Sequence, residues 1–185
     1  MKKIFFIINF FFIGLIAYAQ LETFSISDQE ILELIGGQDV ELSNTQLDYL
    51  AEFGSQQIAQ FNGVNSNLGL DSGIVLATHF AGQLAANPYG LQLNPISGED
   101  VDLSYMLDEL SFPNTLKGVV SIEFDFVPTS DILSFNYVYG SNEYSTSTCS
   151  SSPDPFGIFI SGPGISGPYS NQAENIALVP DPNSP

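Results

Sequence analysis

The chain has 185 residues, of which 21 are acidic and three are basic, and its formal net charge at pH 7 is −18. Such a negative chain repels phosphate groups, which argues against nucleic-acid binding and against attachment to anionic membrane surfaces. Its length suits one domain with a core of its own. The single cysteine, Cys149, has no second cysteine in this sequence, so it is a free thiol or pairs outside the chain.

The N-terminus has the order of a secretory signal peptide. Two lysines are followed by an apolar run over residues 4–16, and Ala17-Tyr18-Ala19 places small residues where a signal peptidase reads them. We expect residues 1–19 to be a signal peptide cleaved between Ala19 and Gln20. The alternative is an uncleaved membrane anchor, but the run falls short of the roughly 20 residues that span a bilayer. No later segment is long and apolar enough to do so.

After a lead-in over residues 20–30, we expect one domain over residues 31–185. Ser27 and Glu30 have the spacing of a helix capping box, and Gly36-Gly37 follows the apolar run as a C-cap would, which predicts one short helix. Strands are expected at residues 74–78, which are the more buried, and less firmly at 57–61 and 40–44. An alternative for residues 45–60 is a helix.

The central part predicts a second short helix and a hairpin. The helix is expected over residues 103–110, with Met106, Leu107 and Leu110 facing inward. Residues 120–126 and 133–139 both alternate between apolar and polar side chains across a Pro-containing turn, which predicts an antiparallel hairpin.

The phase of that alternation places two phenylalanines in one core. Phe124 and Phe135 should lie on neighbouring strands of the hairpin, while Glu123 faces water. Another strand is expected at residues 156–160. Several short strands separated by Gly, Pro, Asn and Ser predict a mainly β fold, a β-sandwich or jelly-roll-like set of antiparallel sheets with one or two short helices.

Catalytic motifs are not visible in the sequence. His79 is the only histidine, so a Ser-His-Asp triad would have to use it, and no G-x-S-x-G elbow accompanies it. Cys149 has no neighbouring histidine or basic residue to activate its thiol. We therefore expect no catalytic residues and no enzymatic activity in this chain.

A calcium site is the cofactor expectation that the sequence supports. Glu143 and Asp154 bound a Ser/Thr-rich loop, and calcium prefers carboxylate, hydroxyl and carbonyl oxygens in such loops. Asp100 and Asp102 form a second, weaker acidic candidate. The alternative is that all four carboxylates are solvated. Zinc is not expected, because one histidine and one cysteine cannot build a structural site.

Six segments in order resemble the choice-of-anchor L domain, a family of exported bacterial proteins. They are SGIVLAT (72–78), DVDL (100–103), FDFVP (124–128), LSFNYVYGSNEY (133–144), DPFGIFISGPGISGP (154–168) and ENIA (174–177). The resemblance runs from about residue 31 to the end. It departs from the family at Asn142, where an acid is usual, and at His79, where glycine is usual. It implies a β-rich extracellular module, often followed by repeats and a type IX sorting domain, and no established catalytic activity.

We therefore interpret the chain as a secreted or cell-surface, non-enzymatic module for adhesion or for binding glycans or proteins. Tyr137, Tyr139 and Tyr144 are candidates for sugar contacts, although core packing is an alternative role for the first two. The chain would meet secretion and anchoring machinery through a segment beyond Pro185, which we expect to exist. The competing hypothesis is an accessory domain of a larger secreted hydrolase, with its catalytic part in that segment.

Overall fold

The computed structural model describes residues 21–37, 40–49, 51–52, 55–82, 84, 98–112, 115–141 and 154–177. Within them the chain forms two α-helices, one 3-10 turn and nine short strands. In chain order they are β1 (Glu22–Phe24), α1 (Asp28–Gly36), β2 (Leu42–Asp48), β3 (Ala51–Glu52), β4 (Ser55–Gln56), β5 (Ile58–Asn62), β6 (Ser72–Leu76), α3 (Val101–Glu109), β7 (Ser121–Phe126), β8 (Phe159–Ile160), η1 (Ser170–Gln172) and β9 (Glu174–Asn175). All strand pairs are antiparallel. The mainly β fold with antiparallel sheets is thus confirmed.

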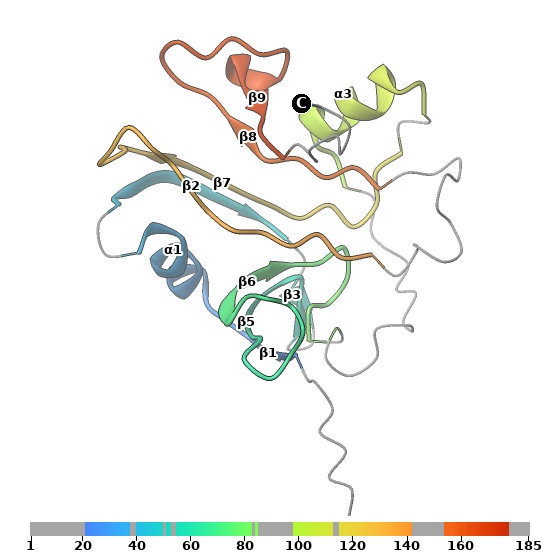
Figure 1. Cartoon of the computed structure of the whole chain (residues 1–185). Coiled ribbons are helices and arrows are strands. Elements are labelled where there is room, and N and C mark those ends of the chain that lie inside the picture. Colours follow the sequence, from blue (N-terminus) through green and yellow to red (C-terminus); the bar gives the residue numbers. More distant parts are fainter. Residues whose placement is uncertain are drawn as a thin grey trace, which may run out of the picture.

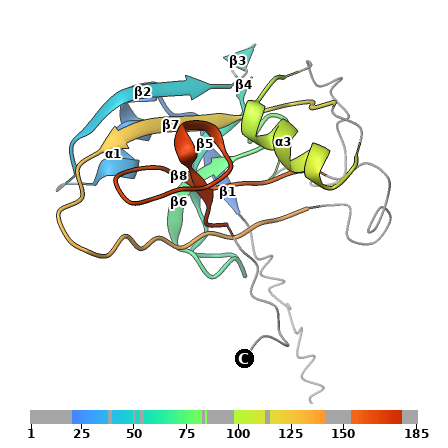
Figure 2. The same cartoon turned by 90° about the horizontal axis from the view of Figure 1, so that it is seen from above.

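The elements are stacked in layers (Figures 1 and 2). The three-stranded sheet β1-β5-β6 and helix α1 form the lower layer of Figure 1, and the β2–β7 pair crosses above them. The β8–β9 pair, η1 and α3 lie above β2–β7. Strand β1 belongs to the stretch that the sequence suggests is a lead-in, and it pairs with β5 through Thr23 and Phe61.

Helix α1 begins as the capping box predicts. The Ser27 N–H donates to Glu30 Oε2 at 2.9 Å, and the Glu30 N–H donates back to Ser27 Oγ at 3.4 Å. These hydrogen bonds, first that of the Ser27 side chain and then that of its backbone, hold the pKa of Glu30 below its ordinary value of 4.5. Gly37 ends the helix at φ 62°, a conformation that suits glycine.

The main core lies between α1, the β1-β5-β6 sheet and the β2–β7 pair. Ile26, Ile31 and Ile58 are its buried centre, and Ile31 and Ile58 have no exposed surface. Half-buried apolar side chains from four elements and from flanking residues pack around them: Ile35, Leu47, Tyr49, Ile74, Val120 and Ile122. Hydrophobic contact with this cluster therefore holds the β2–β7 pair over α1 and β1-β5-β6.

Strand β2 contains an irregularity that its sequence does not predict. Its register on β7 shifts between Ser43 and Gln46, and Asn44 at this bulge has a positive φ of 48°. Asparagine tolerates this conformation better than most residues, and its Nδ2 donates to Asp125 Oδ2 at 2.6 Å. Residues 42–48 and 58–62 are strands, so the helical alternative for residues 45–60 is wrong.

The predicted hairpin does not form. Strand β7 pairs with β2, and residues 133–139 have no strand pairing in the described part of the chain. Phe135 is 46% exposed, so it does not share a core with half-buried Phe124. The alternation itself was interpreted correctly for β7, where Glu123 is exposed. The partner of β7 was predicted wrongly, since β7 pairs with residues 42–48 and not with the segment that follows it in the chain.

Three further expectations need correction. Leu110 is 62% exposed at the end of α3, whereas Leu107 is buried as predicted. Strand β6 is less buried than its apolar sequence suggests, since it is an edge strand and Leu76 is 45% exposed. The strand predicted at residues 156–160 is reduced to β8, because only Phe159 and Ile160 pair with β9.

Candidate functional site

Of the residues weighed as catalytic or metal-binding candidates, the structure describes His79, Asp100, Asp102 and Asp154. His79 is half-buried just after β6, and within the described residues it makes no hydrogen bond to a hydroxyl or carboxylate group. Asp154 is exposed. Glu143, Cys149, Tyr144, Ala19 and Gln20 lie outside the described residues. The described residues contain no group of three or more His, Cys, Asp or Glu side chains that could hold a metal ion.

Asp100 and Asp102 have structural contacts. Asp100 is the N-cap of α3, where its Oδ1 accepts a hydrogen bond from the Leu103 N–H at 2.7 Å. Asp102 Oδ1 accepts one from the Ser170 N–H at 2.8 Å, which ties α3 to η1. Both carboxylates thus help to fix the upper layer of Figure 1, which consists of α3, η1 and the β8–β9 pair. The calcium site remains a prediction.

The upper layer is held by further contacts around Asn175. Its Oδ1 accepts hydrogen bonds from the N–H groups of Ile158 at 3.1 Å and Ala177 at 3.0 Å. Tyr169 packs against Phe159 of β8, with their ring centroids 4.7 Å apart. At Gly167 a Cβ atom would collide with the carbonyl oxygen of Ala173, so a side chain there is not tolerated. These contacts give Asn175, Tyr169, Phe159 and Gly167 structural roles in the described part of the chain.

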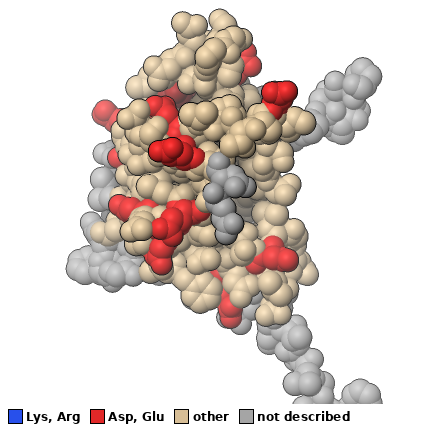
Figure 3. All heavy atoms as spheres, turned by 90° about the vertical axis from the view of Figure 1, so that its left-hand side faces the viewer, with Lys and Arg blue, Asp and Glu red and all other residues tan. Residues whose placement is uncertain are grey.

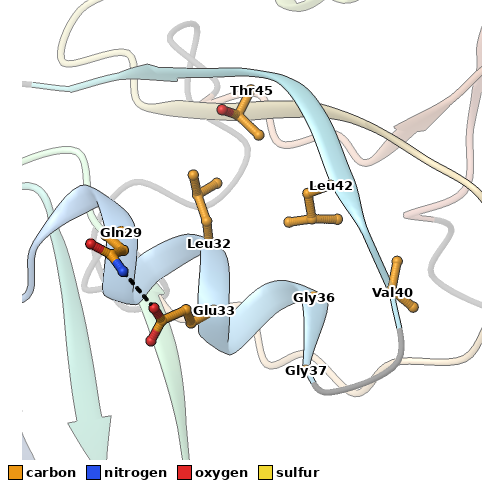
Figure 4. A pocket seen from close by; sticks show the side chains of 8 residues that line it. All are labelled: Gln29, Leu32, Glu33, Gly36, Gly37, Val40, Leu42 and Thr45. Carbon is orange, nitrogen blue, oxygen red and sulfur yellow. Dashed lines mark hydrogen bonds between the residues drawn. The ribbon is translucent and has the colours of Figure 1, made fainter.

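A surface depression lies between α1 and β2 (Figure 4). Its volume is 510 Å³, and Leu32, Leu42 and Val40 supply apolar walls. Its polar side chains largely satisfy each other, since Gln29 Nε2 donates to Glu33 Oε1 at 2.8 Å. Ligand sites usually combine an apolar wall with convergent unsatisfied polar groups. The depression therefore does not stand out as a binding site.

The acidic surface is stabilised largely by neutral donors. Asn62 Nδ2 donates to Glu22 at 3.0 Å, Gln46 Nε2 to Asp48 at 2.9 Å, and the Tyr49 hydroxyl to Asp28 at 2.6 Å. The hydrogen bond to Asp28 raises the pKa of Tyr49 above its ordinary value. Figure 3 shows acidic residues spread over one face with no Lys or Arg among the coloured atoms. A partner for that face would be neutral or basic.

The most distinctive exposed feature is a row of four aromatic rings, Phe135, Tyr137, Phe156 and Tyr139, which we call the aromatic surface. Ring centroids lie 6.3 Å apart for Phe135–Tyr137, 5.8 Å for Tyr137–Phe156 and 5.3 Å for Tyr139–Phe156. All three pairs are tilted by 39–41°. The rings are 39–46% exposed. Three of them stand on one side of the extended segment 133–139, as its alternation dictates.

The sequence matches the family model of the choice-of-anchor L domain over residues 21–185. The chain belongs to the choice-of-anchor L domain family. No curated protein and no solved structure matches it.

Membership confirms the resemblance drawn from the sequence motifs and implies an extracellular or cell-surface protein. Within the described part of this choice-of-anchor L domain, no helix has the length and apolar character to span a bilayer. The aromatic surface falls inside two of the motifs that carry the resemblance, at residues 133–144 and 154–168. Sequence reasoning identified Tyr137 and Tyr139 as candidates. It missed Phe135, whose alternation was interpreted as core packing, and Phe156, which was interpreted only as part of a strand.

Proposed function

We propose that this choice-of-anchor L domain is a non-enzymatic adhesion module that binds an extracellular glycan through the aromatic surface. The observation that carries the proposal is the contiguity of four rings that remain 39–46% exposed. A soluble protein rarely leaves large apolar side chains together in water unless they serve a contact.

The chemistry of the rings suits a sugar. A pyranose ring presents a face of C–H groups that packs on an aromatic face, and its hydroxyl groups can bond to tyrosine hydroxyls at the rim. Tyr137 and Tyr139 combine both properties, since tyrosine joins an apolar body to a polar tip. Rigid aromatic side chains also lose little conformational entropy when they bind. A neutral glycan meets no repulsion from the surrounding carboxylates.

A glycan array probed with the labelled protein tests the proposal. Phe135→Ala and Tyr137→Ala should each weaken binding about three- to tenfold, the loss expected for one aromatic contact. The matched control is Phe24→Ala, because Phe24 on β1 is 49% exposed and lies outside the aromatic surface. Equal losses for Phe24→Ala and Phe135→Ala, or no glycan binding by the wild type, would contradict the proposal. Binding to a protein that is not glycosylated would assign the surface to a protein partner.

A further inference from the structure

The segment that carries three of the four rings has a second unused feature, its main chain. Within the described residues, the N–H and C=O groups of residues 133–138 make no hydrogen bond. Every residue from 132 to 139 is exposed. Figures 1 and 2 place the segment along an outer side of the molecule. It is therefore an extended edge that can accept another strand.

This edge lacks the devices that normally prevent strand pairing. Natural edges are protected by proline, lysine, inward charges or bulges. Strand β2 shows such protection, with a bulge between Ser43 and Gln46. Residues 132–141 contain no charged residue and no proline, and they are rich in Phe, Tyr, Val, Ile and Leu, which favour strands.

We propose that residues 134–138 pair antiparallel with the same residues of a second copy, which gives a twofold dimer. A second copy is the expected partner because the segment is complementary to itself. With the axis at Asn136, Phe135 lies opposite Tyr137 of the other copy, and Ser134 lies opposite its Val138. Aromatic and apolar residues thus meet on one face, and no charge meets a like charge. Pairing uses the strand edge, so the aromatic faces of both copies stay open and form one longer surface.

Charge explains why the contact would be confined to this segment. At a net charge of −18, two copies repel each other over most of their surface. The uncharged edge allows the closest approach at the lowest electrostatic cost. A single pair of short strands forms a small interface, so the dimer is expected to be weak and to strengthen when salt screens the repulsion.

Sedimentation velocity of the purified protein from ~1 μM to ~1 mM tests this. The wild type should shift from monomer to dimer across the series, and more readily at higher salt. Asn136→Asp brings two carboxylates face to face at the axis and should weaken dimerisation at least about tenfold. Ser166→Asp is the control, since it adds the same charge at an exposed position outside the segment. A monomer at every concentration, or equal dimerisation by both variants, would overturn the proposal.

Hydrogen exchange measured on the wild type tests the proposal even if Asn136→Asp does not fold. In the wild type, amide exchange over residues 134–138 should slow as concentration rises, while exchange in the 161–168 loop should not. Fast exchange at all concentrations would overturn the proposal. Slow exchange already in the monomer would show that another segment of the chain covers this edge, which also overturns it. The four rings are unchanged in Asn136→Asp, so glycan binding and dimerisation can fail separately.

Discussion

Replacement of Ile31 by alanine tests the layered core most sharply. Ile31 has no exposed surface and projects from α1 into the cluster with Ile26 and Ile58, against which β2, β6 and β7 residues pack. Deleting its outer atoms removes buried apolar surface and leaves a cavity, which costs about 2–5 kcal/mol for such a substitution. Ile31→Val removes one methylene group and should cost about 0.5–1.5 kcal/mol.

Urea unfolding followed by far-ultraviolet circular dichroism measures these losses. For both variants the urea midpoint should fall while the slope of the unfolding free energy against urea stays constant. For Ile31→Ala the corresponding fall in Tm is about 4–20 °C for a domain of this size. Leu34→Ala is the matched control on the same helix, because Leu34 is 45% exposed. It should cost only about 0.5 kcal/mol. Equal losses at Ile31 and Leu34 would refute the packing of α1 against the sheets.

Three other outcomes are expected. Because the pKa of Glu30 is lowered in the folded state, its contribution to stability is present above the unfolded-state value and is lost as pH falls through the folded value. Glu30→Gln should therefore flatten the acid side of the Tm–pH curve, and an unchanged curve would contradict the capping box. Millimolar calcium should raise Tm relative to chelator, and Glu143→Gln with Asp154→Asn should abolish the gain; a full response in that double variant would place any ion elsewhere. N-terminal sequencing of exported protein should begin at Gln20, and a start at Met1 would disprove cleavage.

Local elements were predictable because their causes are local. The capping box at Ser27 and Glu30 and the glycine at position 37 define α1 within a few residues, and the alternation in β7 assigns its two faces. Strand pairing is different, since β7 joins residues that lie about eighty positions earlier in the chain. A bulge at Asn44 also breaks the alternation that would have marked β2. Neither the long-range pairing nor the bulge leaves a local signal.

The aromatic surface was only partly predictable for the same reason. Alternation shows that Phe135, Tyr137 and Tyr139 share one side of a segment, but it does not show whether that side meets a core or water. In the described structure these rings are 43–46% exposed, so no layer of the fold covers that side of the segment completely. Phe156 joins them from a different motif, through ring contacts that no spacing rule connects. The sequence alone does not show that these rings are exposed.

Nuclear magnetic resonance of the aromatic side chains tests the central claim, that the aromatic surface is the binding site, most directly. The chain has no tryptophan, so its ring signals come from Phe, Tyr and the single histidine. Titration with the best glycan from the array should shift the ring signals of Phe135, Tyr137, Tyr139 and Phe156 along a single saturating curve, while those of Phe24 stay constant. Saturable binding that leaves these four rings unshifted would contradict the account.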